Sequence, residues 1–189
     1  SKDDVQLPVV AWSAGQREFT LLLLGLYWLM PAGKINRRDD IEWVVIEEPE
    51  MGLHPRAVLA FLVMVLELMR RGYRVALTTH STVVLDAMWG LRTLQRYGGS
   101  EADMLRMFGL PINPSTKALA QAALAKTFGV FYFEPESEYR GAKVREITDL
   151  DPGSLDVTQA QWGGLTAFSA AVGDVVAEVV QRHMQGGDA

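Results

Sequence analysis

Residues 43–50 read Trp-Val-Val-Ile-Glu-Glu-Pro-Glu, a stretch typical of a buried strand that ends abruptly in acidic residues. It begins with an unbroken apolar run, as in a strand that is covered on both faces in the middle of a sheet. A second apolar run ends in Thr78-Thr79-His80-Ser81. Ligands of open α/β sheets bind beyond the carboxyl ends of the strands. We therefore expect Glu47, Glu48 and His80 at one edge of a parallel sheet.

Strand and helix signals alternate around these two runs. Strands are predicted over 41–47 and 74–79, and each is followed by a helix, which begins at Pro55 in the first case and near Ser81 in the second. A helix over about 15–30 precedes them. This order predicts an α/β fold in which helices flank a mostly parallel sheet.

The rest of the chain predicts a helical segment, a hairpin and a last helix. Two short helices are expected between 98 and 127, and we interpret 88–128 as a helical insertion. Strands over 130–134 and 142–148 predict a β-hairpin. A closing helix is expected from 162 to about 183. All of this fits a single domain, 1–189.

Composition excludes several classes of protein. With 49% hydrophobic and 22% charged residues, the chain predicts a large core and not a disordered protein. The 18 basic and 23 acidic residues give a formal net charge of −5, so no overall basic field attracts nucleic acid. The sequence has no cysteine, which excludes disulfides, thiolate zinc sites and a cysteine nucleophile.

The apolar stretches and the first residues predict a cytoplasmic protein. The longest apolar stretch, 19–30, is shorter than the roughly 20 residues that cross a bilayer, so we interpret it as a core helix. Residues 1–4, Ser-Lys-Asp-Asp, do not resemble the start of a signal peptide. We therefore expect neither a membrane span nor export.

Glu47 and Glu48 are the first candidates for chemistry. Neighbouring residues of a strand point to opposite faces, so the two carboxylates are expected to have different roles. One can bind magnesium, which prefers oxygen ligands and keeps several waters. The other can orient or deprotonate an attacking water. The alternative is a strand that simply reaches the surface at its end.

Residues 44–50 together with Gly52-Leu53-His54-Pro55 resemble the Walker B segment and the following loop of ABC-type ATPases. The similarity is greatest to the AAA and OLD-like branch of these P-loop NTPases. The resemblance implies that Glu47 is the metal-associated acid and Glu48 the catalytic glutamate. It also implies that 52–55 is a D-loop-like turn that meets a partner head. Within this turn we expect His54 to have a structural role.

His80 lies in Thr-His-Ser, which is similar to the switch-histidine segment of the same family. The resemblance implies that His80 reaches the γ-phosphate of the nucleotide and takes part in catalysis. The alternative is a histidine that satisfies the start of the next helix, with Ser81 as its N-cap.

Ser13-Ala14-Gly15-Gln16 resembles the signature motif of the family, usually Ser-Gly-Gly-Gln. The resemblance implies that Ser13, Gly15 and Gln16 contact the nucleotide held by the opposite subunit. A helix N-terminus also suits an anion physically, because its free N–H groups and dipole are positive. Ser-x-x-Gln is equally a capping box that needs no ligand, and Ala14 departs from the family pattern.

The phosphate-binding loop of the family is absent from this sequence. No Gly-x-x-x-x-Gly-Lys-Ser/Thr occurs, so no backbone cradle for the phosphates is expected, and the chain by itself should bind ATP poorly. The resemblance covers roughly 11–89 and, more loosely, the hairpin over 130–148. We therefore expect the carboxy-terminal part of a larger head, incomplete without an N-terminal lobe that carries the phosphate loop.

The leading hypothesis is an ATPase half that binds and hydrolyses ATP with Mg²⁺ as one member of a dimer of heads, either a homodimer or a heterodimer. DNA repair, phage defence or a related process is the expected setting. The first alternative is a non-catalytic, ATPase-like interaction module. The second is a metal-dependent nuclease that uses Glu47, Glu48, Glu50 and His80.

Nucleic acid as a partner has no support in the pattern of basic residues. Between 89 and 127, basic side chains are spread among aromatic ones: Arg92, Arg96, Arg106, Lys117 and Lys126. Spread charges of this kind are typical of a solvated helix face.

Overall fold

The computed structural model describes residue 8 and residues 11–33, 36–135 and 141–186. The chain divides into two compact units, 1–126 and 127–189. Residues 34–35 of the loop expected after the first helix, residues 136–140 of the hairpin loop and residues 1–4 lie outside the described residues. The expectation of one domain over 1–189 stays a prediction.

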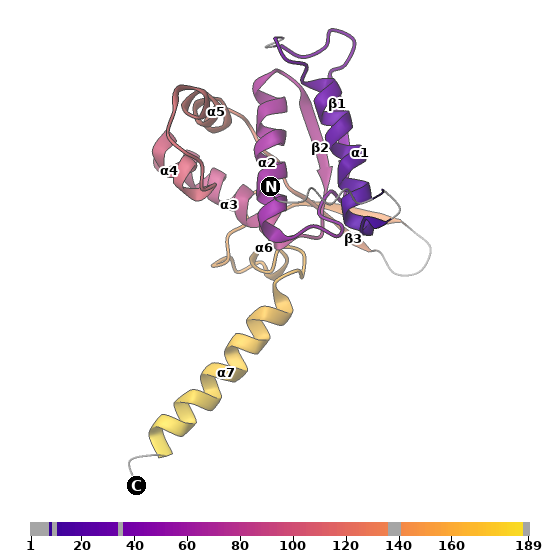
Figure 1. Cartoon of the computed structure of the whole chain (residues 1–189). Coiled ribbons are helices and arrows are strands. Elements are labelled where there is room, and N and C mark those ends of the chain that lie inside the picture. Colours follow the sequence, from indigo (N-terminus) through magenta and orange to yellow (C-terminus); the bar gives the residue numbers. More distant parts are fainter. Residues whose placement is uncertain (1–7, 9–10, 34–35, 136–140, 187–189) are drawn as a thin grey trace, which may run out of the picture. The chain divides into compact units, whose positions relative to one another are not determined.

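The first unit contains the alternating helices and strands that the sequence predicts (Figure 1). In chain order its elements are α1 (Ala14–Leu29), β1 (Trp43–Glu47), α2 (Pro55–Arg70), β2 (Arg74–Thr78), α3 (Thr82–Tyr97), α4 (Glu101–Met107) and α5 (Pro114–Leu124). The last two are the short helices expected between 98 and 127. An α/β arrangement with helices around a small parallel sheet is therefore confirmed for this unit.

β1 and β2 are parallel neighbours, with a register that runs from Trp43 opposite Arg74 to Glu47 opposite Thr78. The described residues add no third strand to this sheet, so the larger parallel sheet that we expected is not formed by them. The expectation that β1 is covered on both faces is also wrong for these residues. Trp43 and Val45 are 55% and 67% exposed, whereas Ile46 on the other face is buried. An apolar run shows that a strand suits a covered position and does not show what covers it.

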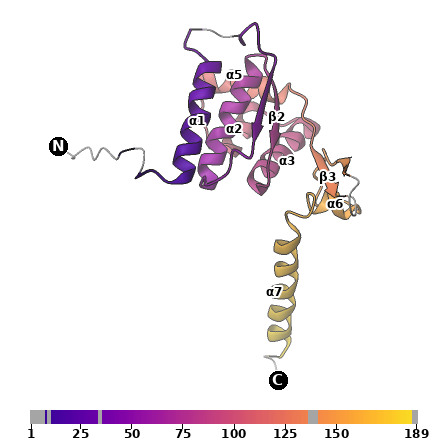
Figure 2. The ribbon, with the colours of Figure 1, turned by 90° about the vertical axis from the view of Figure 1, so that its right-hand side faces the viewer.

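The core of the first unit forms around α2, which packs against β2, α3 and α5 (Figure 2). Pro55 stands at the helix start, where its missing N–H costs nothing, and the Nδ1 atom of His54 accepts a hydrogen bond from the Arg56 N–H at 3.2 Å. The structural role expected for His54 is thus confirmed. Phe61 and Leu68 of α2 are fully buried, and each stabilises the fold by about 1.5–3 kcal/mol.

α1 is fixed near its carboxyl end and exposes much of its middle. The Tyr73 hydroxyl donates to the Leu29 carbonyl at 2.8 Å, and the Arg38 side chain donates to the Trp28 carbonyl at 2.9 Å. Between its ends, Leu21 and Tyr27 are 71% and 73% exposed. The interpretation of this apolar stretch as a core helix therefore holds for only one side of it. Within the described part of the chain, no helix is both long and apolar enough to cross a membrane.

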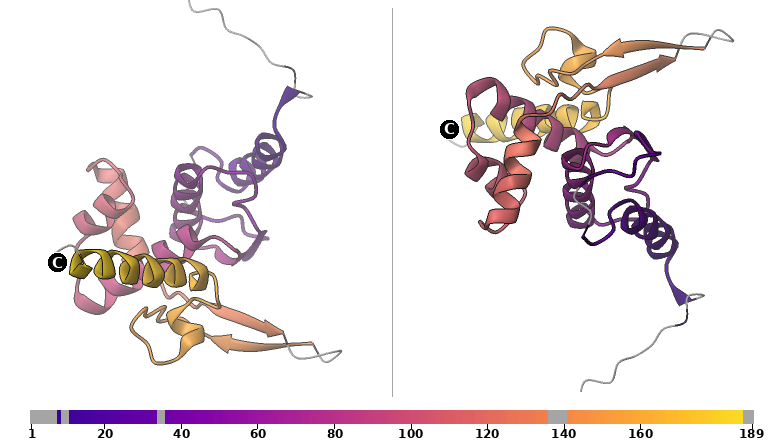
Figure 3. Two further views of the ribbon diagram at one scale, coloured as in Figure 1. Left: turned by 90° about the horizontal axis from the view of Figure 1, so that it is seen from below. Right: turned by 90° about the horizontal axis from the view of Figure 1, so that it is seen from above.

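The second unit is a hairpin followed by helices. Its elements are β3 (Phe131–Pro135), β4 (Ala142–Glu146), α6 (Val157–Ala160) and α7 (Ala167–Gly186). Figure 3 shows β3 and β4 side by side and running in opposite directions, and Phe131 lies opposite Glu146 in this antiparallel pair. The predicted hairpin is thus present.

The last helix begins later than the sequence pattern predicts, at Ala167 and not at Trp162. Trp162, Gly163 and Gly164 have φ angles of +51°, +70° and +95°, and these left-handed values interrupt a right-handed helix. The Trp162 indole is buried and donates to the Leu150 carbonyl at 2.9 Å. This tryptophan therefore serves the core of the unit and does not belong to the helix.

A compact cluster of charged side chains lies at the carboxyl end of α2. The Arg70 and Arg71 guanidinium groups donate to the Glu67 carboxylate at 2.6 to 2.8 Å. Burial by itself would raise the pKa of Glu67, but the hydrogen bonds and charges of the two arginines outweigh it and leave this pKa below its ordinary value. A lowered folded-state pKa stabilises the fold above the ordinary glutamate pKa, and this contribution is lost as the pH falls through the lowered value.

We expect Glu67→Gln to lower the free energy of unfolding at pH 7 by about 0.5–1 kcal/mol, the range of partly exposed ion pairs. The difference from wild type should shrink as the pH falls below the ordinary glutamate pKa, and it should vanish below the lowered pKa of the folded state, where the wild-type carboxylate is protonated. Urea denaturation at a series of pH values measures this. Glu42→Gln is the control, since its pair with Arg74, at 3.3 Å, is largely exposed. Equal effects of the two variants at pH 7 would contradict the assignment.

Candidate functional site

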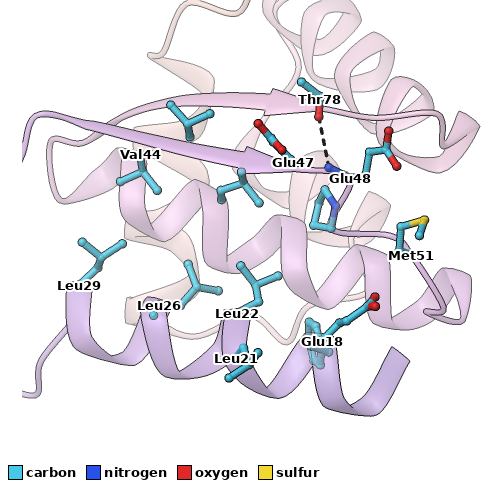
Figure 4. Close-up of a pocket in the computed structure, with 15 residues that line it drawn as sticks. Glu18, Leu21, Leu22, Leu26, Leu29, Val44, Glu47, Glu48, Met51 and Thr78 are labelled. Carbon is cyan, nitrogen blue, oxygen red and sulfur yellow. Dashed lines mark hydrogen bonds between the residues drawn. The ribbon is translucent and has the colours of Figure 1, made fainter. Parts of the chain in front are cut away.

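The parallel pairing of β1 and β2 brings the ends of both strands to one edge. The backbone N–H of Glu48 donates to the Thr78 carbonyl at 3.1 Å and to the Thr78 hydroxyl at 3.2 Å (Figure 4). The chain that leaves β1 is therefore held at the point where β2 ends. Thr78 has this role in the site although the sequence pattern did not single it out.

Glu48 has a strained backbone, with φ at +41°. A residue with a side chain pays about 1–3 kcal/mol for such a conformation, and strain of this kind gathers at functional sites. Because Glu48 lies beyond the strand end, the alternation of a strand does not govern it. Figure 4 shows the carboxylates of Glu47 and Glu48 both on the side of β1 away from α1. The opposite faces that we expected for this pair are thus not observed.

The structure brings Glu48 and His80 together. The Nε2 atom of His80 lies 3.3 Å from Glu48 Oε1, with 77% of the histidine side chain and 44% of the glutamate side chain exposed. Ser81 is the N-cap of α3, but its side chain makes no capping hydrogen bond. The His80 side chain thus faces the acid of the neighbouring strand end. The catalytic roles of Glu48 and His80 stay predictions.

Glu50 holds the segment that carries His80. Its Oε1 atom accepts hydrogen bonds from the Thr79 hydroxyl at 2.7 Å and from the His80 backbone N–H at 2.6 Å. The Thr79 hydroxyl in turn accepts from the Ser81 N–H at 2.9 Å. Sequence reasoning gave Glu50 a role only in the nuclease alternative. The hydroxyl of Thr79 is a donor that a nearby acid can use, but no local pattern in the sequence indicates which acid it meets.

Ser13 and Gln16 form the capping box that opens α1. The Ser13 hydroxyl accepts from the Gln16 N–H at 3.2 Å, and Gln16 Oε1 accepts from the Ser13 N–H at 2.9 Å. The motif therefore forms the capping box that was expected as its structural alternative. Both residues are exposed, and contact between them and a partner's nucleotide stays a prediction.

Gly15 is buried against the turn after β1. A Cβ atom on Gly15 would lie 2.4 Å from the Gly52 carbonyl oxygen, so only glycine lets the start of α1 approach this turn so closely. Gly52 itself has a φ of +68°, which favours glycine again. The D-loop-like turn and the signature-like helix start thus contact each other through their backbones.

A cavity of about 1000 Å³ separates the middle of α1 from β1. Most of its wall is apolar, with Leu22 and Leu26 on one side and Val44 on the other, while Glu18 and Glu48 lie near one end (Figure 4). An apolar wall does not compensate a triphosphate for the loss of its water. The carboxylates at one end of the cavity suit a cation, and they repel the phosphates of a nucleotide unless a cation offsets their charge.

Glu47 is exposed on the outer face of β1. Among the described residues, no three or more histidine, aspartate or glutamate side chains are grouped closely enough to hold a metal ion by themselves. Magnesium commonly takes one or two carboxylates and completes its shell with water and phosphate oxygens. Glu47 fits such a shared ion.

Residues 1–86 match the family model described as "AAA domain, putative AbiEii toxin, Type IV TA system". The matched segment contains α1, β1, α2 and β2, and with them Glu47, Glu48 and His80. The match supports an AAA, P-loop ATPase-like relationship for this part of the chain, and it extends neither to the ABC type nor to the OLD-like branch. No curated protein and no solved structure matches the chain.

We expect Gly15→Ala to lower the free energy of unfolding by about 1–3 kcal/mol, because the new methyl group meets the Gly52 backbone. The matched control in the same helix is Gly25→Ala. Its Cβ would enter open space, so it should raise stability by about 0.5–1 kcal/mol. Urea denaturation of both variants measures this difference. Stabilisation by both substitutions would show that the contact between Gly15 and Gly52 does not form.

Proposed function

We propose that this chain is the part of an ABC-type ATPase head that carries the catalytic glutamate and the signature-like helix, and that it hydrolyses ATP as a member of a dimer. One observation carries this proposal. Glu48 and His80 meet at the joint edge of two parallel strands, and Glu48 has a strained backbone there. Backbone strain of this kind gathers at functional sites, and a catalytic carboxylate benefits from a fixed position.

Each acidic or basic group of the site has a separate role in this proposal. Glu47 holds the magnesium shell, and the ion supplies positive charge to the phosphate oxygens when it is bound. Glu48 orients the attacking water and accepts its proton. His80 donates a hydrogen bond to an oxygen of the terminal phosphate. Positioning and electrostatics therefore supply most of the rate enhancement.

Further polypeptide completes the head in this proposal, with the phosphate loop among its parts. The sequence contains no phosphate loop of its own. The bare outer face of β1 and the exposed middle of α1 both support a covering segment, because contiguous apolar surface of this kind commonly marks an interface. The cavity between these two elements has the apolar wall that side chains of such a segment need.

The second head of the dimer binds at the start of α1. Ser13 and Gln16 are exposed there, and the N-terminus of a helix favours an anion. Gly15 is buried against Gly52 and so links this surface to the turn after β1. Gly15 contributes to the surface through its backbone. The partner is a second copy or a related head.

Defence is the process that we favour among DNA repair, phage defence and related settings. The description of the matching family names a toxin of a Type IV TA system. A toxin fits defence better than repair. The acidic net charge of the chain gives no overall field that attracts nucleic acid, which is the usual ligand of repair proteins.

The test is Glu48→Gln in the intact head, that is, this chain together with the segment that supplies the phosphate loop. We expect ATP turnover to fall by about 100-fold or more, because glutamine cannot accept the proton of the attacking water. ATP binding should persist, and ATP-bound dimers should accumulate. Steady-state hydrolysis, nucleotide binding and light scattering measure the three effects.

Glu42→Gln is the matched control, because Glu42 lies beside the other end of β1, pairs with Arg74 and has no part in the proposed chemistry. Its turnover should stay at the wild-type rate. Undiminished turnover in Glu48→Gln would reject the catalytic role. An intact wild-type head that binds a protein partner and has no ATP turnover would support the interaction module in its place.

A further inference from the structure

We propose that Glu50 is a positioning residue for hydrolysis, which fixes His80 relative to Glu48. The inference rests on the proposed function, since it gives Glu50 a task in the same site. Glu50 lies two residues after Glu48, on the turn that follows β1. It reaches across to the segment after β2 and binds it at two points.

The two bonds to Glu50 account for the shape of the His80 segment. The Thr79 hydroxyl and the His80 N–H donate to the same carboxylate oxygen, at 2.7 and 2.6 Å. Hydrogen bonds to a charged acceptor are shorter and stronger than neutral ones. Without Glu50, both donors would lose this acceptor at the point where β2 passes into α3. The backbone of His80 would then be free to turn.

The turn that carries Glu50 is itself held in place. The Met51 N–H donates to the Glu48 carbonyl at 3.1 Å, and the Leu53 N–H donates to the Glu50 carbonyl at 2.9 Å. Glu48 also contacts His80 through its side chain, at 3.3 Å. A closed ring of covalent and non-covalent links therefore joins Glu48, Glu50, Thr79 and His80. A change at Glu50 is transmitted to the distance between the two catalytic candidates.

The second carboxylate oxygen of Glu50 supports a positioning role. Oε2 is buried and has no hydrogen-bond partner among the residues that the structure describes. Buried polar atoms are nearly always paired, so an unpaired carboxylate oxygen is a cost that a purely structural residue avoids. Glutamine would keep the accepting oxygen, whereas alanine would remove it. A comparison of Glu50→Ala with Glu50→Gln therefore tests whether the accepting oxygen is the part of the side chain that matters.

The experiment combines two readouts on Glu50→Ala and Glu50→Gln. In the 189-residue chain, the ¹⁵N–¹H resonance of His80 reports the contact without any nucleotide. In the intact head, kcat and KM for ATP report its consequence. We expect Glu50→Ala to move the His80 amide proton upfield and to lower kcat by about 10- to 100-fold, as loss of an outer-shell partner does, with KM little changed. Glu50→Gln should keep the His80 amide resonance and kcat close to their wild-type values.

Glu42→Gln is the control for a lost charge, because Glu42 lies beside the other end of β1 and should leave both readouts unchanged. If Glu50→Ala does not fold, Thr79→Val and Thr79→Ser decide the question. The valine removes the hydroxyl donor to Glu50, and the serine keeps it. We expect the valine to move the His80 resonance and lower kcat, and the serine to leave both at the wild-type values.

Failure of this inference and failure of the proposed function look different. An intact wild-type head without ATP turnover contradicts the proposed function. An active head in which Glu50→Ala, or Thr79→Val in its place, leaves kcat and the His80 resonance unchanged overturns the role of Glu50 alone. A fall in kcat without movement of the His80 resonance overturns it as well, because the effect then does not pass through His80.

Discussion

The parallel pairing of β1 and β2 is the constraint on which the site depends. Its register places Glu47 opposite Thr78, so the two strands end together. Two segments that are about 30 residues apart in the sequence, at Glu48 and at His80, then leave the sheet at the same edge. A shift of the register would separate these side chains by at least the rise of one strand residue, about 3.3 Å. This shift equals the 3.3 Å distance between His80 Nε2 and Glu48 Oε1, so it would break their contact.

Hydrogen bonds to the backbone, more than contacts between side chains, give this edge its geometry. Thr78 binds the N–H of Glu48, and Glu50 binds the N–H of His80. The direct contact between Glu48 and His80 is exposed, and exposed polar contacts between side chains contribute little to stability. The backbone therefore holds the two side chains near each other and leaves them free to bind a ligand. Such an arrangement is preorganised and still accessible.

Sequence reasoning could find the edge because strand ends and apolar runs are local signals. The meeting of Glu48 and His80 follows from two parallel strands, and the pattern of strand, helix, strand and helix is enough to predict it. The contact between Glu50 and Thr79 could not be predicted in this way, because it depends on two loops whose conformations are set by the fold. The turn at Trp162 is a different case. Gly163-Gly164 is a turn signal in the sequence, and the apolar residues after it outweighed this signal in our interpretation.

No local sequence pattern could predict that one face of β1 is exposed. An unbroken apolar strand predicts cover on both faces, and the described residues cover only the face of Ile46. Trp43, Val45 and Glu47 alternate along the strand and so share the bare face. A segment that covers Trp43 and Val45 would therefore also remove water from around Glu47. A carboxylate that loses its water needs a positive partner, so such a segment would make a cation beside Glu47 more necessary than it is at an exposed position.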